Sequence, residues 1–100
     1  MATFVSTIKL TEEGIRSIGD TTKRAAAFKT AAKAMGVKVI NQFWTLGQFD
    51  GLIVFEAPDG ETATAAMLQL GSLDFVHTST MRAFNAAEME KILAIKGKRR

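Results

Sequence analysis

Hydrophobic and polar residues alternate in four segments of the chain, and each such segment predicts a β-strand. Residues 3–10 alternate loosely and are rich in β-branched and aromatic side chains, which favours a first strand. Comparable runs over residues 37–46, 51–57 and 75–84 predict three more. Because only residues 47–50 separate the second run from the third, we expect these two strands to form a hairpin.

Apolar residues with helical spacing lie between these strands. Residues 21–35 place them on one helix face, with Asp20 as the expected N-cap and Gly36 as the C-terminal stop. A second such face follows Asp59, also an expected N-cap, and ends at Gly71. The apolar positions are Phe28, Ala31, Ala32 and Met35 in the first helix and Ala63, Ala66, Met67 and Leu70 in the second.

Two shorter helical segments complete the pattern. Residues 12–18 favour a short helical turn, and Asn85 with Glu88 three residues later resembles the capping box that starts a helix. The order of elements is therefore βαββαβ followed by a C-terminal helix. This order predicts an α+β, ferredoxin-like fold, in which both long helices cover one face of a four-stranded antiparallel sheet.

The other face of the predicted sheet is also apolar. Residues 52–55 read Leu-Ile-Val-Phe without a polar alternation, and Phe43 and Trp44 point to opposite faces of the second strand. A sheet with one face in water alternates more cleanly. The short terminal helix is too small a cover, so we predict a homodimer, or a higher homo-oligomer, with sheet packed against sheet.

Size and charge indicate one domain with a basic tail. A chain of 100 residues with 47% hydrophobic residues forms a single core, which we assign to residues 1–95, leaving 96–100 as the tail. The tail holds four of the 13 basic residues, so nine basic residues face ten acidic ones in the rest of the chain. Because the body is nearly neutral, we expect no nucleic-acid function.

Several function classes lack the residues that they need. The chain has no cysteine and one histidine, which argues against disulfides and a protein-only zinc site. No glycine-rich phosphate loop precedes either long helix, and we expect no cofactor. No apolar run reaches the ~18 to 20 residues of a membrane span, and the start has no signal-peptide pattern. We therefore expect a cytoplasmic protein without a membrane partner.

Residues 47–51, Gly-Gln-Phe-Asp-Gly, are either a turn or part of a site. Asp50 followed by Gly51 between apolar runs favours a turn, because Gly51 tolerates positive φ and Asp50 can hydrogen-bond its own backbone. The same segment lies at one end of the sheet, where the mouth of a barrel admits a small ligand. In that case Asp50 or Gln48 would present an oxygen to the ligand.

Three further side chains are candidates for a site. Trp44, the only tryptophan, would either cap the barrel interior or pack in the dimer core. Arg82, inside the fourth strand, needs an anionic partner, which would be Asp50, Glu56 or a ligand. His77 is a weak candidate for a general base or haem ligand, and an ordinary surface residue is the alternative.

Segments spread along the chain resemble the GYD domain family, small bacterial and archaeal proteins of largely uncharacterised function. They are Thr11–Arg16, Asp20–Arg24, Phe43–Gly51, Glu56–Pro58, Leu70–Leu73 and Thr80–Phe84. The resemblance implies a dimeric α/β barrel of ferredoxin-like subunits. Phe49 departs from the Gly-x-Tyr-Asp signature of the family, so any role of that tyrosine's hydroxyl is excluded here.

These observations favour a homo-oligomeric α/β-barrel protein that binds a small, partly apolar molecule. The expected ligand-binding residues are Trp44, Gln48, Asp50 and Arg82. The alternative is a small oxygenase-like or isomerase-like enzyme, with or without a haem link, that uses His77. Similar barrels contain pockets built from Asn, Trp and His, but Asn41 and Trp44 are three residues apart and lie on opposite faces of a regular strand. A third reading is an assembly module whose interior is filled by side chains.

Overall fold

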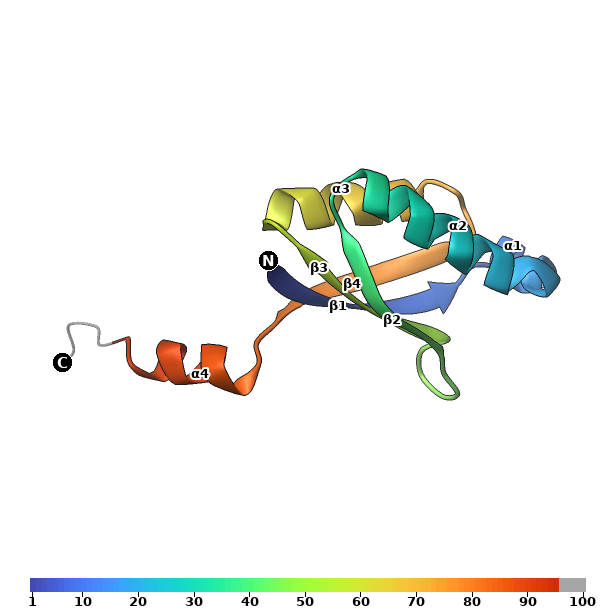
Figure 1. Cartoon of the computed structure of the whole chain (residues 1–100). Helices are drawn as coiled ribbons and strands as arrows, with labels where there is room; N and C mark the ends of the chain where they lie inside the picture. The colour runs from blue at the N-terminus through green and yellow to red at the C-terminus, as the bar shows by residue number, and fades with distance from the viewer. Residues whose placement is uncertain (96–100) are drawn as a thin grey trace.

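The computed structural model describes residues 1–95 as one antiparallel sheet with two long helices on one face (Figure 1). Its elements are β1 (Ala2–Leu10), α1 (Glu12–Arg16), the 3₁₀ turn η1 (Ile18–Asp20), α2 (Thr21–Ala34), β2 (Lys38–Trp44), β3 (Gly51–Ala57), α3 (Gly60–Gly71), β4 (Val76–Ala83) and α4 (Ala86–Leu93). The basic tail assigned to residues 96–100 lies outside the described residues.

The sheet has the strand order β2-β3-β1-β4, and all neighbouring strands are antiparallel. β1 and β3 occupy the centre, where Phe4 pairs with Phe55 on one side and with Arg82 on the other. This arrangement is consistent with the ferredoxin-like fold expected from the order of elements. The predicted hairpin between the second and third strands is also confirmed.

The core lies between the sheet and the two long helices. β3 buries alternate residues, and its Phe55 is fully buried and stacks on Phe4 with 5.5 Å between ring centroids. On the helices, Ala32 and Ala66 are fully buried. Small side chains at these positions let the helix backbone approach the sheet closely, which explains why helices so rich in alanine pack here.

The ends of the helices largely follow the sequence signals. Asp59 accepts a hydrogen bond from the Thr62 amide at 2.7 Å, and Gly36 has a φ of 82° just after α2. One expectation is wrong, because within residues 1–95 the Asp20 side chain accepts no capping hydrogen bond. Asp20 belongs to η1, which runs straight into α2, so its backbone is not in the extended conformation of a capping residue.

The second face of the sheet carries an apolar patch, as the sequence predicts, bordered by polar residues such as Thr7 and Ser79. Val5, Leu52 and Val54 lie on this face at the centre, since they alternate with the helix-facing residues of β1 and β3. On the outer strands, the Phe43 side chain is 52% exposed and the Met81 side chain 50% exposed. We refer to these five apolar residues as the open face.

The terminal helix α4 projects away from the sheet and from both long helices (Figure 1). The capping box predicted at its start is present, and a salt bridge of 3.2 Å joins Glu88 to Arg82. The Asn85 amide, followed by Arg82, lowers the pKa of Glu88 below its usual value. Arg82 therefore pairs with Glu88 rather than with Asp50 or Glu56, because α4 begins soon after β4 ends and places Glu88 beside Arg82. Four apolar side chains around α4 remain exposed, namely Phe84, Met89, Leu93 and Ile95.

We predict that Gly14→Ala lowers the free energy of unfolding by about 2 kcal/mol. Gly14 is buried in α1, and a Cβ there would overlap the carbonyl oxygen of Phe75, which already accepts a hydrogen bond from the Thr11 amide. Urea denaturation followed by circular dichroism measures the effect. Gly19→Ala is the control, because a Cβ at Gly19 meets nothing within 4 Å among the described residues. Equal stability of the two variants would contradict this packing argument.

Candidate functional site

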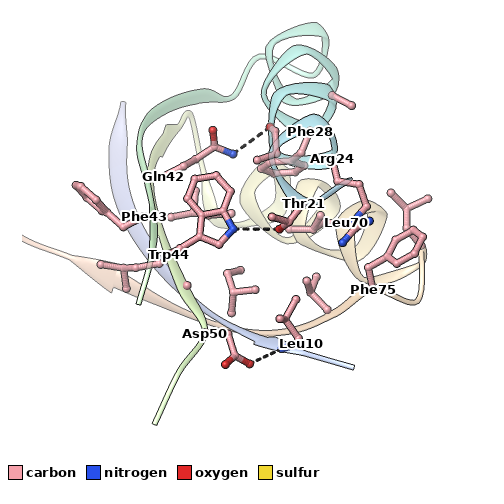
Figure 2. Close-up of a pocket in the computed structure, with 18 of the residues that line it drawn as sticks. Leu10, Thr21, Arg24, Phe28, Gln42, Phe43, Trp44, Asp50, Leu70 and Phe75 are labelled. Atoms are coloured by element: carbon pink, nitrogen blue, oxygen red, sulfur yellow. Dashed lines mark hydrogen bonds between the residues drawn. The ribbon is translucent and has the colours of Figure 1, made fainter. Parts of the chain in front are cut away.

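A cavity of about 280 Å³ lies between the helix-covered face of the sheet and the start of α2 (Figure 2). Its walls are mostly apolar and come from β1, β2, β3, α2 and the segment from α3 to β4. The main apolar lining residues are Ile8, Leu10, Phe28, Ile53, Leu70 and Phe75. Because these elements are distant in sequence, the cavity exists only in the folded domain.

Two hydrogen bonds from β2 to α2 fix one wall of this cavity. The Trp44 indole Nε1 donates to the Thr21 hydroxyl at 3.0 Å, and the Gln42 amide Nε2 donates to the Ala25 carbonyl at 3.1 Å (Figure 2). Both side chains point into the cavity, whereas Phe43 between them points away. Trp44 therefore lies on the helix-covered face, and not on the open face where a role in the barrel interior or dimer core would place it.

Asp50 lies at the rim of the cavity and ties β3 to the end of β1. Its carboxylate accepts a hydrogen bond from the Leu10 amide at 2.8 Å, and its own amide donates to the Ile8 carbonyl at 2.8 Å (Figure 2). Asp50 is thus a structural residue of the loop and also part of the cavity lining. The turn and site readings of this residue coexist.

The positive φ that the sequence analysis connected with Gly51 occurs at Gly47 instead. In the described chain, Gly47 has a positive φ of 119°, whereas Gly51 does not. The link is a loop over residues 45–50 rather than a two-residue turn, so the left-handed residue falls earlier. Gly51 is required for space, because a Cβ there would approach the Phe43 carbonyl oxygen to 3.0 Å.

Arg24 is the cavity residue that the sequence analysis missed. Its Nη1 donates to the Ser17 carbonyl at 2.9 Å, and its guanidinium carbon lies 4.3 Å from the centre of the Phe75 ring. Its Nη2 is buried and has no hydrogen-bond acceptor among residues 1–95. Arg24 stands four residues before Phe28, on the buried face of α2, and this unusual position for a cation was the available signal.

The other sequence candidates lie elsewhere. Gln48 is exposed in the loop, where its carbonyl accepts a hydrogen bond from Lys9 Nζ at 3.3 Å. Arg82 lines a second, shallower pocket of about 270 Å³ beside α3. His77 is exposed opposite Lys9, and it is not among the described residues that line either pocket. The structure therefore brings Trp44 and Asp50 to one cavity without Gln48, Arg82 or His77.

Two further searches are confined to residues 1–95. Within that range, no three His, Cys, Asp or Glu side chains cluster in a way that could hold a metal ion. No helix in the same range is both long enough and apolar enough to cross a membrane.

Comparisons with known proteins show both relatives and a similar fold. A Thermus thermophilus protein named glutamine synthetase and cystathionine beta-lyase binding protein is 32% identical over 90 residues, which span 89% of this chain and 95% of that protein. The crystal structure of TTHA0845 from Thermus thermophilus matches with a TM-score of 0.57 and 23% identity, covering 86% of this chain and 96% of that one. At that identity, the second match supports the fold alone.

The sequence model of the GYD domain matches residues 4–93, which include every strand residue from Phe4 onward and all four α-helices. The relative from Thermus thermophilus is consistent with this match. The chain therefore belongs to the GYD domain family.

Proposed function

We propose that this protein is a homodimeric binding protein that takes a small, largely apolar molecule into the cavity between the sheet and α2. The cavity is the observation that carries the proposal. Its volume of about 280 Å³ is near the lower end of the ~300 to 1,000 Å³ typical of ligand pockets. Most of its lining residues are apolar, as is typical of ligand pockets.

The walls of the cavity are already held in place. Trp44 and Gln42 are bonded to α2, and Asp50 is bonded to β1. A ligand would therefore meet fixed walls and would lose little free energy in ordering them. The proposal keeps Trp44 and Asp50 as ligand-contacting residues. Gln48 and Arg82 have no part in it. The alternative of an enzyme that uses His77 stays a prediction, and His77 lines neither of the two pockets described above.

Filling the cavity should remove the ligand. Ala31 lines the cavity on the inner side of α2, and Ala31→Leu would occupy part of the space. We expect native mass spectrometry of protein purified gently from its own host to show a discrete bound mass, with occupancy falling roughly tenfold in this variant. Ala26→Leu, at an exposed position of the same helix, should keep the wild-type occupancy. A wild-type protein without any bound mass would contradict the proposal.

The open face and α4 support the homodimer. Both are apolar and exposed, and both belong to the same chain. A twofold axis would set the open face of one subunit against that of the other and bring each α4 within reach of the partner. Exposed apolar areas of this extent are typical of protein interfaces. The ligand cavity lies on the other side of the sheet, so dimerisation would leave it unfilled.

A charge at the centre of the open face should separate the subunits. Val54 pairs with Val5 and Asn41 in the middle of the sheet, and Val54→Lys would place an unpaired ammonium in the dimer interface. We expect sedimentation velocity at micromolar concentration to show a dimer for the wild type and a monomer for this variant. Ala26→Lys adds the same charge on the far side of α2 and should remain dimeric. A monomeric wild type would rule out the homodimer.

We also propose binding to a partner enzyme as a second function, which the relative named for two such partners favours. The loop over residues 45–50 offers a surface for it. This loop projects beyond the sheet (Figure 1), with Leu46 fully exposed and Phe49 40% exposed. Exposed apolar side chains on a projecting loop are suited to inserting into a pocket of another protein.

Interferometry with purified glutamine synthetase and cystathionine beta-lyase from the source organism tests this second function. We expect Leu46→Asp to weaken the binding of either enzyme roughly tenfold or more, because it removes an apolar anchor. Leu68→Asp is the matched control, since Leu68 is equally apolar and is exposed on α3. The proposal fails if the wild type binds neither enzyme, or if both variants lose binding alike.

A further inference from the structure

We infer that the ligand of the cavity is a compact apolar molecule with a single carboxylate, and that the carboxylate binds Arg24 Nη2. This inference rests on the proposed binding of a small molecule and adds its chemical class. Two independent observations carry it, namely the apolar cavity and the buried Nη2 that faces no acceptor from residues 1–95.

The position of the Arg24 guanidinium is fixed from two sides. The Ser17 carbonyl accepts a hydrogen bond from Nη1, and the ring of Phe75 lies 4.3 Å from the guanidinium carbon. Phe75 also lines the cavity, so the stacked guanidinium forms part of the same wall. These contacts orient the Arg24 guanidinium and leave its Nη2 without a hydrogen-bond acceptor among residues 1–95. Because Nη2 itself has almost no accessible surface, the Arg24 side chain would have to move slightly toward the cavity to meet a ligand.

The charge of Arg24 is not neutralised by the described part of the chain. A guanidinium stays protonated at any physiological pH, and holding it partly out of water, as at Arg24, is costly unless an anion pairs with it. Within residues 1–95, Arg24 forms no salt bridge. A neutral acceptor would satisfy the Nη2 hydrogen bond and leave the charge uncompensated. An anionic ligand satisfies both.

Three carboxylates could compete for Arg24, and each is engaged elsewhere. Asp20, four residues before Arg24, forms its salt bridge with Lys23 at 4.0 Å. Glu13 bonds Arg16 and Ser17, which together lower its pKa, with only a minor contribution from Arg24. Asp50 is at a separate place on the rim, where its carboxylate bonds the Leu10 amide (Figure 2). The anion that Arg24 lacks would therefore come from outside the described chain.

The surroundings favour one carboxylate over a phosphate. One nitrogen of one arginine is free, and a doubly charged group would bring an excess negative charge into an apolar cavity. Thr21, one helical turn before Arg24, lines the same cavity. Its oxygen accepts the Trp44 hydrogen bond, which leaves its hydroxyl proton free to donate to a second carboxylate oxygen. The rest of the lining is suited to an aromatic or branched aliphatic body.

Calorimetric titration with two probes that differ only in charge tests the inference. The probes are 3-phenylpropanoate and 3-phenylpropanamide at pH 7. In the wild type we expect the acid to bind roughly tenfold more tightly than the amide, as a charge-assisted hydrogen bond implies. In Arg24→Gln the preference should vanish, because the affinity for the acid falls while that for the amide hardly changes. Arg16→Gln, which removes an exposed arginine of α1, should keep the preference.

A measurement on the unaltered protein covers the case in which Arg24→Gln does not fold. The side-chain Nε–H resonance of Arg24 in a ¹⁵N-labelled wild type should shift on adding the acid and should not shift on adding the amide. Equal binding of both probes, or an unmoved Arg24 signal at saturating acid, overturns the carboxylate inference and leaves the cavity as a binding site. Binding of neither probe overturns the inference and counts against the cavity as a site for such molecules.

Discussion

The central strand β3 carries apolar side chains on both faces, while the chain supplies long helices for only one of them. This imbalance shapes the rest of the molecule. On the covered face, Phe4 and Phe55 stack under α2 and α3 and form the core. On the other face, Val5, Leu52 and Val54 keep an apolar surface that the described chain does not cover. The first face provides the core of the domain, and the second is the surface on which the proposed homodimer would form.

The cavity arises from the same alanine-rich packing that builds the core. Small side chains allow α2 to lie close to the sheet where Ala32 faces Phe55 and the space is filled. Towards the start of α2, small residues stand on both walls, with Ala25, Ala27 and Ala31 on the helix and Gly51 on β3. With no large side chain to fill the space between them, that region stays open. The cavity thus follows from where the alanines and glycines fall along the chain.

A shift of register in β2 decides which side chains reach the cavity. The pairing with β3 slips between Val39 and Asn41, and beyond this point Gln42 and Trp44 face α2 while Phe43 faces outward. Because side chains alternate along a strand, a slip by one residue exchanges the two faces. The sequence predicts that Phe43 and Trp44 point to opposite sides, and this is confirmed. It does not reveal the bulge, which is why the sequence analysis associated Trp44 with the barrel rather than with α2.

Local signals were sufficient for most of the fold and for little of the site. The cap at Asp59, the capping box at Asn85 and the bounds of β3 depend on neighbouring residues, and all three are readable from the sequence. The tie of Asp50 to β1 depends on how distant segments meet, and the partner of Arg82 depends on the path of the chain from β4 into α4. Both were missed. The sequence analysis missed Arg24, because it selected apolar residues at helical spacing and an arginine is not apolar.

Arg24 is also the clearest exception to the pattern of apolar side chains on the inner face of α2. Along the rest of α2, each buried position carries an apolar side chain that helix packing requires. A partly buried arginine with an unsatisfied nitrogen costs stability. Residues that break the packing pattern in this way tend to mark functional positions, because binding of a ligand there offsets the stability that they lose. The same reasoning applies to the exposed apolar residues of α4, whose cost is offset only when a second surface covers them. Under the two proposals, a small anion would offset the cost at Arg24, and a protein partner would offset the cost of the exposed apolar residues of α4.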